Sequence, residues 1–234
     1  MSAKYSACLK GELLCPGDKS ISQRVLIIGS FLNQEILISN ILASSDPICT
    51  ANALNQVNAN LTFNKLSNTV KTVKRQMPFQ DPTESLDLGN SGTGARLLTG
   101  FLSGLGINAT ITGDKSLSSR PMKRIVEPLT KMGFKLNSNN HRLPIEITQS
   151  TGSSFFDYNS PISSAQVKSS ILLAALTGSI ETKITEPIGS RDHTERMLKY
   201  FGADIHSEIK DEKNIIYFSP SDCLLYTSPS PRDQ

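Results

Sequence analysis

The chain has 234 residues, which is enough for one large domain or two small ones. Hydrophobic residues make up 38% and charged residues 19%, a balance that indicates a globular protein and excludes a largely disordered one. The apolar runs are far shorter than the roughly 20 residues of a membrane-spanning helix, and the net charge of +3 is too small to indicate a nucleic-acid-binding surface.

The first predicted helix begins near Ser20, within the segment PGDKSISQR (16–24). Ser20 and Gln23 match a capping box, in which the two residues satisfy each other's backbone N–H groups. Arg24 lies four residues after Ser20, so the two share one helix face, with Lys19 beside them. An amine, a hydroxyl and a guanidinium around a helix N-terminus suit a phosphate or carboxylate ligand. A solvated capping turn with two surface cations is the alternative.

A predicted strand centred on Ile38 follows, and then a second helix opened by Asp46-Pro47. Asp46 could hold a substrate hydroxyl, but an aspartate at a helix start is more typical of an N-cap.

The second unit begins its main helix near Gly92, within LDLGNSGTGAR (86–96). Its glycines allow a ligand to approach the backbone closely. Arg96 lies 72 residues after Arg24, so the same cation recurs at an equivalent position. A flexible strand-to-helix turn is the alternative. Farther along, Pro121 holds Arg120 in an extended conformation and suits a first helical turn.

The third main helix begins near Ala165, where Ser164 and Gln166 offer neutral hydrogen-bonding groups. These groups suit hydroxyls or carboxylate oxygens, although an ordinary N-cap is the alternative. Arg191 precedes a predicted Asp192 N-cap, and a solvated arginine is its alternative. His193 is more typical of packing than of metal ligation, because no second His or Cys lies at ligand spacing.

Three kinds of landmark repeat in the same phase along the chain. The predicted main helices start near residues 20, 92 and 165, and the predicted strands centre on Ile38, Ile111 and Ile184. Three further segments each predict a helix end, a left-handed residue and a strand. They are Leu54–Leu61, Leu129–Leu136 and Leu198–Ile205. The chain is therefore predicted to be an α/β protein of three repeated units, with chance matching of a loose pattern as the alternative.

Units of this length favour a closed domain over a solenoid, whose repeats run at about 20–50 residues. If the units surround a pseudo-threefold axis, their helix N-termini point at one region. Each N-terminus carries about half a positive charge and unpaired N–H groups. The repeat therefore predicts an anion-binding site where the helix N-termini meet.

The four cysteines, Cys8, Cys15, Cys49 and Cys223, show neither a CxxC motif nor a metal-ligand spacing. We therefore expect free thiols, no metal site and a reducing compartment. The segment MSAKYSACLKGELL has no apolar signal region. The expected location is the cytoplasm.

Five motifs in order resemble the 5-enolpyruvylshikimate-3-phosphate synthase family, most closely its class II-like bacterial form. They are PGDKSISQR (16–24), LDLGNSGTGAR (86–96), GDKSLSSRPM (113–122), SSAQVKSS (163–170) and EPIGSRDHTERML (186–198).

The resemblance implies one domain of a two-domain fold, built from three β-α-β-α-β-β units around a pseudo-threefold axis. The implied units are about 15–85, 86–158 and 159–220 within a domain at 15–220. Residues 1–14 would form strands that pair partly with a second domain. Residues 221–234 resemble nothing in the family and are expected to be a foreign tail. The resemblance thus covers the N-terminal half of a family member.

The resemblance also implies an activity, the transfer of the enolpyruvyl group of phosphoenolpyruvate to the 5-hydroxyl of shikimate 3-phosphate. Phosphate is released, and no metal or organic cofactor takes part. Lys19 is implied as the catalytic residue that meets both substrates. The implied shikimate 3-phosphate residues are Lys19, Ser20, Arg24, Ser164, Gln166 and Arg191. The implied phosphoenolpyruvate residues are Lys19, Asn90, Gly92, Thr93, Arg96, Arg120 and Gln166.

We expect such a half-length chain to be inactive alone, because the family's second domain supplies acid/base carboxylates and further cations. Two other functions remain open: a relative that acts on UDP-N-acetylglucosamine, and a half-domain that only binds an anion. The expected partners are the two small-molecule substrates, without nucleic acid or membrane, and the full-length protein is expected to be a monomer.

Overall fold

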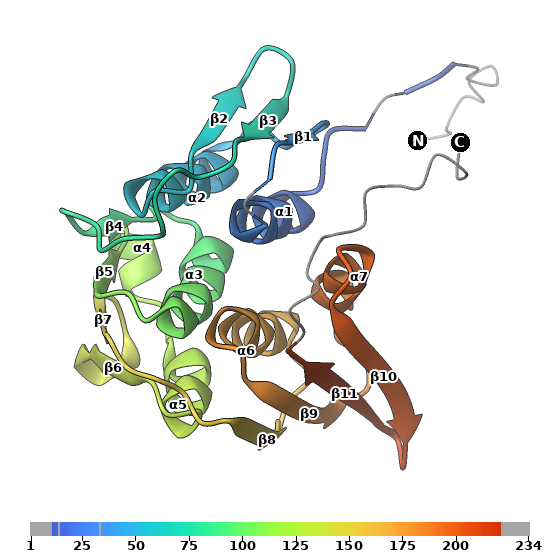
Figure 1. Cartoon of the computed structure of the whole chain (residues 1–234). Coiled ribbons are helices and arrows are strands. Elements are labelled where there is room, and N and C mark those ends of the chain that lie inside the picture. Colours follow the sequence, from blue (N-terminus) through green and yellow to red (C-terminus); the bar gives the residue numbers. More distant parts are fainter. Residues whose placement is uncertain (1–10, 14, 33, 221–234) are drawn as a thin grey trace, which may run out of the picture.

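The structure is a computed structural model that describes residues 11–13, 15–32 and 34–220. Three small sheets lie on the outside and the main helices pack against one another between them (Figure 1). The molecule is thus built from three similar units, each with a sheet on the outside and helices facing the centre, as the repeat predicts.

The units share one order of elements, except that no opening strand is described in the first and the second has an extra short helix, α4. The first contains α1 (Lys19–Phe31), β1 (Ile36–Ile38), α2 (Ser45–Gln56), β2 (Leu61–Asn64) and β3 (Thr69–Thr72). The second contains β4 (Leu86–Asp87), α3 (Gly92–Leu105), β5 (Ala109–Thr112), α4 (Lys115–Ser118), α5 (Lys123–Lys131), β6 (Lys135–Ser138) and β7 (Ile145–Thr148). The third contains β8 (Phe155–Asn159), α6 (Ala165–Gly178), β9 (Glu181–Pro187), α7 (His193–Tyr200), β10 (Asp204–Lys210) and β11 (Lys213–Ser219).

The sheets confirm that the units are copies of one topology. The strand orders are β4-β5-β7-β6 and β8-β9-β11-β10, and in each the first pair is parallel and the others antiparallel. The first sheet, β1-β3-β2, matches the last three positions of this order. The strands predicted within 1–14 fall mostly outside the described residues, and 11–13 contain no strand.

The predicted helix ends are confirmed by the backbone. Asn58, Gly133 and Gly202 all have positive φ, between 72° and 106°, just after α2, α5 and α7. Glycine adopts this conformation without a steric penalty, and asparagine tolerates it. The left-handed residue ends each second helix and turns the chain into the next strand.

Several local predictions are wrong. The N-cap of α1 is Asp18, whose Oδ1 accepts a hydrogen bond from the backbone N–H of Ile21 at 2.8 Å, so Ser20 does not cap the helix. Asp46 lies in the first turn of α2, whose N-cap is Ser44. Pro121 precedes α5 instead of lying in its first turn.

The predicted boundary at residue 159 falls inside β8, so the third unit begins at Phe155. Strand β8 pairs with β9 in parallel, as β4 does with β5, which assigns the whole strand to the third unit. The tail predicted at 221–234 lies outside the described residues.

The inner helices α3 and α6 pack closely enough for backbone contact. A Cβ atom added to Gly100 would lie 2.0 Å from the backbone oxygen of Ser170, and one added to Gly104 would lie 2.1 Å from Oγ1 of Thr177. Both helices carry long buried apolar runs. These small residues therefore let two units share one core.

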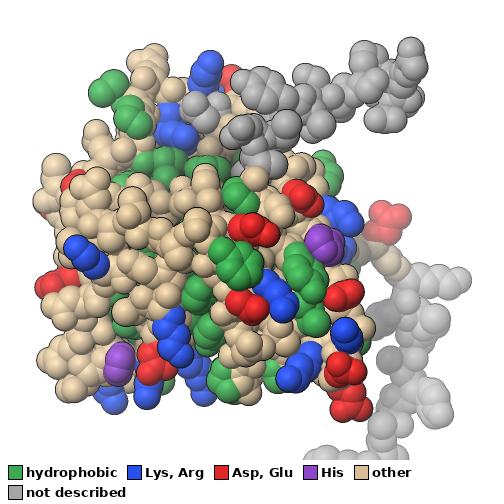
Figure 2. Space-filling model, turned by 60° about the horizontal axis from the view of Figure 1, so that its bottom comes forward, with side chains coloured by type: hydrophobic (Ala, Val, Ile, Leu, Met, Phe, Trp, Pro, Cys, Tyr) green, Lys and Arg blue, Asp and Glu red, His purple; other side chains and the backbone are tan. Residues whose placement is uncertain are grey.

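Among the described residues no helix combines the length and hydrophobicity needed to cross a bilayer. The face drawn in Figure 2 intersperses positive and negative side chains, in keeping with the small net charge. The buried apolar side chains instead form one core, to which all three units contribute.

Candidate functional site

A polar cavity of about 410 Å³ lies where the starts of the inner helices meet. It is lined by Lys19, Asp46, Asn90, Gly92, Thr93, Arg96, Arg120 and Gln166. These residues come from all three units, and α1, α3 and α6 each contribute from their first turns. The predicted meeting of helix N-termini is confirmed.

Three cations and one carboxylate line this cavity. Nζ of Lys19 lies 2.9 Å from Oδ2 of Asp46, and the side chains are 54% and 16% exposed. An ion pair this exposed holds its partners weakly, so an entering anion can compete for the ammonium. Asp46 was expected to act as a helix cap, and its place on the wall emerges only from the fold.

Arg96 projects into the cavity from the first turn of α3. Its Nη1 donates to the carbonyl oxygen of Gly92 at 3.1 Å. Burial lowers the pKa of Arg96, and the nearby guanidiniums of Arg120 and Arg124 lower it further. A bound anion would relieve this repulsion among three cations, which is the electrostatic signature of an anion site.

Asn90 holds Arg120 at the cavity edge. Nη2 of Arg120 donates to Oδ1 of Asn90 at 2.5 Å, and Nδ2 of Asn90 donates to Oδ2 of Asp114 at 2.8 Å. Asp114 is also the N-cap of α4, and these hydrogen bonds lower the pKa of its carboxyl group. One carboxylate thereby orients an amide and, through it, a guanidinium.

A repeated motif could have revealed Asp114. The sequence Gly-Asp-Lys-Ser occurs at 17–20 and again at 113–116, and in both copies the aspartate caps a helix. The repeat therefore marks the start of α1, whose Lys19 lines the cavity, and the start of α4, whose cap Asp114 holds Asn90 of the cavity wall.

Gln166 and Thr93 meet across two units. Nε2 of Gln166 donates to Oγ1 of Thr93 at 3.0 Å, which joins the starts of α6 and α3. The structure therefore brings the predicted residues Lys19, Asn90, Gly92, Thr93, Arg96, Arg120 and Gln166 to one cavity.

Arg24 lies beneath the cavity wall instead of on it, with only 1% of its surface exposed. Nε donates to Oγ1 of Thr194 at 2.8 Å, and Nη2 donates to Oγ of Ser169 at 2.9 Å. Nη1 donates to both Ser20 oxygens. Burial lowers the pKa of Arg24, while Glu195 acts to raise it. Arg24 therefore joins α1, α6 and α7 and orients Ser20.

Ser164 and Arg191 lie outside the cavity lining. Ser164 is the N-cap of α6, and its Oγ accepts from the N–H of Val167 at 3.5 Å. Arg191 is exposed in the segment before α7 and lies near enough to Arg24 to lower its pKa. Ser20 and Ser164 lie next to the lining residues Lys19 and Gln166 in the chain, and Arg191 lies near Arg24, which bonds Ser20. We refer to Ser20, Ser164 and Arg191 as the region beside the cavity.

Cavity volume alone would select a different place. A larger cavity of about 620 Å³ is lined by residues of α1 and α7, among them Ile21, Val25, Tyr200 and Phe201. It contains none of the predicted anion-binding residues. The smaller cavity is the candidate site because its cations and helix starts converge.

The arrangement suits two anions side by side. The cavity offers two guanidiniums and an ammonium for a phosphate and a carboxylate, and the adjacent region offers hydroxyls and Arg191. Among the described residues no three His, Cys, Asp or Glu side chains gather as a metal site would require. The two described cysteines, Cys15 and Cys49, are free thiols.

Comparison with known proteins gives a consistent result. A family model described as EPSP synthase (3-phosphoshikimate 1-carboxyvinyltransferase) matches residues 4–225, including the first residues of the segment predicted to be foreign. A 3-phosphoshikimate 1-carboxyvinyltransferase of Petrotoga mobilis is 47% identical over 84% of the chain and 46% of its own length. The Coxiella burnetii protein of that name is 41% identical over 90% of the chain and 48% of its own length.

Solved structures show the same relationship. EPSP synthase from Acinetobacter baumannii superposes with a TM-score of 0.81 at 35% identity, over 92% of this chain and 48% of that one. The enolpyruvyl transferase NikO from Streptomyces tendae, at 12% identity and a TM-score of 0.58, shares the fold. The chain spans about half the length of the curated relatives it matches.

Proposed function

Because the chain belongs to the EPSP synthase family, we propose that it supplies one half of a site that transfers enolpyruvyl from phosphoenolpyruvate to shikimate 3-phosphate. The observation that carries the proposal is the convergence of Lys19, Arg96 and Arg120 with three helix N-termini on one cavity. Two multiply charged anions repel each other in water, and cations of this kind allow them to be held together.

Phosphoenolpyruvate would occupy the cavity itself. Arg96 and Arg120, which line this cavity, would be the cations nearest its phosphate and carboxylate, and Gly92 would keep the wall open. Thr93 and Gln166 would orient the same ligand through hydrogen bonds. Lys19 would leave Asp46 and reach both substrates, which makes it the proposed catalytic residue.

Shikimate 3-phosphate would bind beside the cavity, against Ser20, Ser164, Gln166 and Arg191. Arg24 would act on this ligand mainly through Ser20, because its own donors already have acceptors. The proposed division places phosphoenolpyruvate next to Arg96 and Arg120 and shikimate 3-phosphate next to Arg191, with Lys19 shared by both.

The proposed chemistry is addition followed by elimination. C3 of phosphoenolpyruvate gains a proton, C2 becomes electrophilic, and the 5-hydroxyl of the other substrate adds to C2. The tetrahedral intermediate then expels phosphate. The chain spans about half the length of its relatives. We propose that the acid and base come from residues that correspond to the other half of those relatives. Cytoplasmic location and a monomeric state remain predictions.

Isothermal titration of the 234-residue chain tests the proposal. We expect shikimate 3-phosphate and phosphoenolpyruvate to bind, and UDP-N-acetylglucosamine not to bind. Removing one charge-assisted hydrogen bond costs about 1.5–3 kcal/mol, so Arg96→Ala should weaken phosphoenolpyruvate binding by about 10–100-fold. The control is Lys65→Ala, which removes an exposed cation from the turn between β2 and β3.

Three outcomes would contradict the proposal. In the first, neither shikimate 3-phosphate nor phosphoenolpyruvate binds. In the second, the nucleotide sugar binds more tightly than they do. In the third, Arg96→Ala and Lys65→Ala lose the same amount of phosphoenolpyruvate affinity. A phosphate-release assay then measures whether this chain turns over the two substrates by itself. We expect no release by this chain alone.

A further inference from the structure

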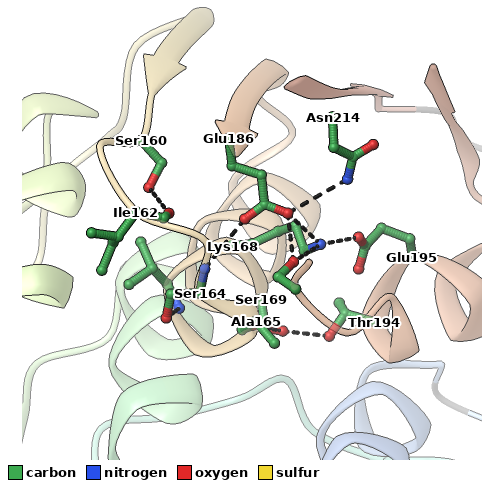
Figure 3. A network of polar contacts seen from close by, with 12 residues as sticks. Ser160, Ile162, Ser164, Ala165, Lys168, Ser169, Glu186, Thr194, Glu195 and Asn214 are labelled. Carbon is green, nitrogen blue, oxygen red and sulfur yellow. Dashed lines mark hydrogen bonds and ion pairs between the residues drawn. The ribbon is translucent and has the colours of Figure 1, made fainter. Parts of the chain in front are cut away.

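Three charged side chains form a buried group near Ser164 and Arg191, and the proposed function does not use them. Lys168 on α6 faces Glu186 on β9 and Glu195 on α7 (Figure 3). Nζ of Lys168 lies 2.8 Å from Oε1 of Glu186 and 2.6 Å from Oε1 of Glu195. The side chains are 1%, 1% and 9% exposed, respectively.

Glu186 is the most highly connected member. Its Oε1 accepts from Nζ of Lys168 at 2.8 Å and from Oγ of Ser190 at 2.5 Å, and Nδ2 of Asn214 lies 3.5 Å away. Its Oε2 accepts from the backbone N–H of Ser164 at 3.4 Å. Lys168 also donates to Oγ of Ser190 at 2.5 Å.

These contacts join two segments that border the proposed sugar-phosphate region. Ser164 begins α6, and Ser190 immediately precedes Arg191. One carboxylate oxygen holds the first segment and the other holds the second. Neither Lys168 nor Glu186 is exposed, and neither lines the cavity, so they act on a ligand only through the residues they hold.

Stability alone is a weak reason for such a group. Desolvating buried charges costs about as much as their attraction returns, and apolar replacements of similar volume are often neutral or stabilising. What an ionic network contributes instead is orientation, because each carboxylate oxygen accepts hydrogen bonds from a defined set of donors.

Resting on the proposed function, we propose that Lys168 and Glu186 are positioning residues that fix Ser164 and Arg191 for shikimate 3-phosphate. They belong to the site of that substrate and not to the phosphoenolpyruvate cavity, whose cations they do not contact. Disturbing them should therefore weaken one ligand and spare the other.

Titration of Glu186→Gln with each ligand tests this difference. The amide keeps one acceptor but turns an NH₂ group toward either Ser164 N–H or the Lys168 and Ser190 donors. We expect shikimate 3-phosphate to bind about tenfold more weakly or worse, with phosphoenolpyruvate affinity changed by less than about twofold. Lys168→Met should show the same pattern, and Lys168→Arg should recover part of the affinity because it keeps a charged donor.

The matched control is Lys183→Met, which removes an exposed ion pair with Asp157 in the same sheet. It should leave both affinities unchanged. Circular dichroism shows whether the charge variants fold. If they do not, Ser190→Ala replaces them in the test, because it removes only one small hydroxyl group. It should weaken shikimate 3-phosphate binding by about threefold or more.

The inference is overturned if folded Glu186→Gln or Ser190→Ala binds shikimate 3-phosphate as the unmodified chain does. Equal weakening of both ligands also overturns it, because that pattern indicates a general structural role. Failure of the unmodified chain to bind either ligand is a different result, which rejects the proposed function itself.

Discussion

At the scale of single residues, similar amino acids have different roles according to their burial. Arg24 and Arg96 occupy equivalent positions and both bond the carbonyl four residues earlier. Arg96 reaches the cavity, whereas Arg24 is buried among the hydroxyls of Ser20, Ser169 and Thr194. The sequence therefore predicts the cation at each position, and the neighbouring helices decide its task.

Gly92 keeps the cations of the cavity in place. A Cβ atom there would lie 2.9 Å from Nη1 of Arg96 and 3.1 Å from Nη1 of Arg120. We predict that Gly92→Ala displaces both guanidiniums and weakens phosphoenolpyruvate binding by about tenfold, the equivalent of roughly 1.4 kcal/mol. Titration calorimetry measures this change. Unaltered phosphoenolpyruvate affinity in Gly92→Ala would show that these guanidiniums do not hold the ligand.

Glu195 predicts a dependence of stability on pH. Burial raises its pKa above the ordinary 4.5, although Lys168 acts in the opposite direction. Its contribution to stability is therefore complete below about pH 4.5 and is lost as the pH rises through the raised pKa. We predict that Glu195→Gln, which avoids this loss, becomes more stable relative to the unmodified chain as the pH rises.

Urea denaturation between about pH 4.5 and 8 measures this difference in the free energy of unfolding. Glu84→Gln, which alters an exposed carboxylate, is the control. A difference between Glu195→Gln and the unmodified chain that stays constant or falls with pH would contradict the prediction.

At the scale of helices and strands, short sequence patterns predict helix ends better than helix beginnings. The left-handed residues Asn58, Gly133 and Gly202 are recognisable because few residues adopt positive φ. Helix starts are ambiguous because Asp, Ser and Asn occur together and any of them can cap. The N-cap positions of Ser164 at α6 and Asp192 at α7 agree with the sequence patterns. At α1 and α2 the N-caps are instead Asp18 and Ser44.

Asp18 gives a test at this scale. Its side chain satisfies the N–H of Ile21 at the start of α1. We predict that Asp18→Ala lowers the free energy of unfolding by about 1 kcal/mol and that Asp18→Asn retains most of it, because Asn caps as well as Asp. Urea denaturation of both variants measures the effect. Equal losses in the two variants would indicate that charge, and not capping, is responsible.

At the scale of the whole molecule, three units share one core and one polar cavity. Helices α3 and α6 touch through Gly100 and Gly104, and hydroxyls of Ser170 and Thr177 donate to the α3 carbonyls of Arg96 and Phe101. This contact sets how close the N-termini of the two helices lie, and hence the separation of Thr93 and Gln166 at the cavity.

Gly100→Ala should separate these helices. Its Cβ atom would lie 2.0 Å from the backbone oxygen of Ser170, which no side-chain movement relieves. We predict a loss of about 3 kcal/mol in the free energy of unfolding. The same change at Gly29 of α1 would meet only Ile38 at 3.4 Å and Thr72 at 3.9 Å. Gly29→Ala should therefore be neutral or stabilise by up to about 1 kcal/mol. Thermal and urea denaturation compare the two variants, and similar stabilities would refute the close packing.

The sequence by itself determined the three units, the order of their elements and the identity of the cavity cations. These properties are local, because periodic apolar residues, left-handed turns and repeated motifs act over a few neighbouring residues. Only the tertiary structure decided that Asp46 faces Lys19, that Arg24 is buried, and that Lys168 meets Glu186 and Glu195. Those outcomes depend on which helices and strands pack together, and the partners of a buried charge can lie far away in sequence, as Thr194 does from Arg24.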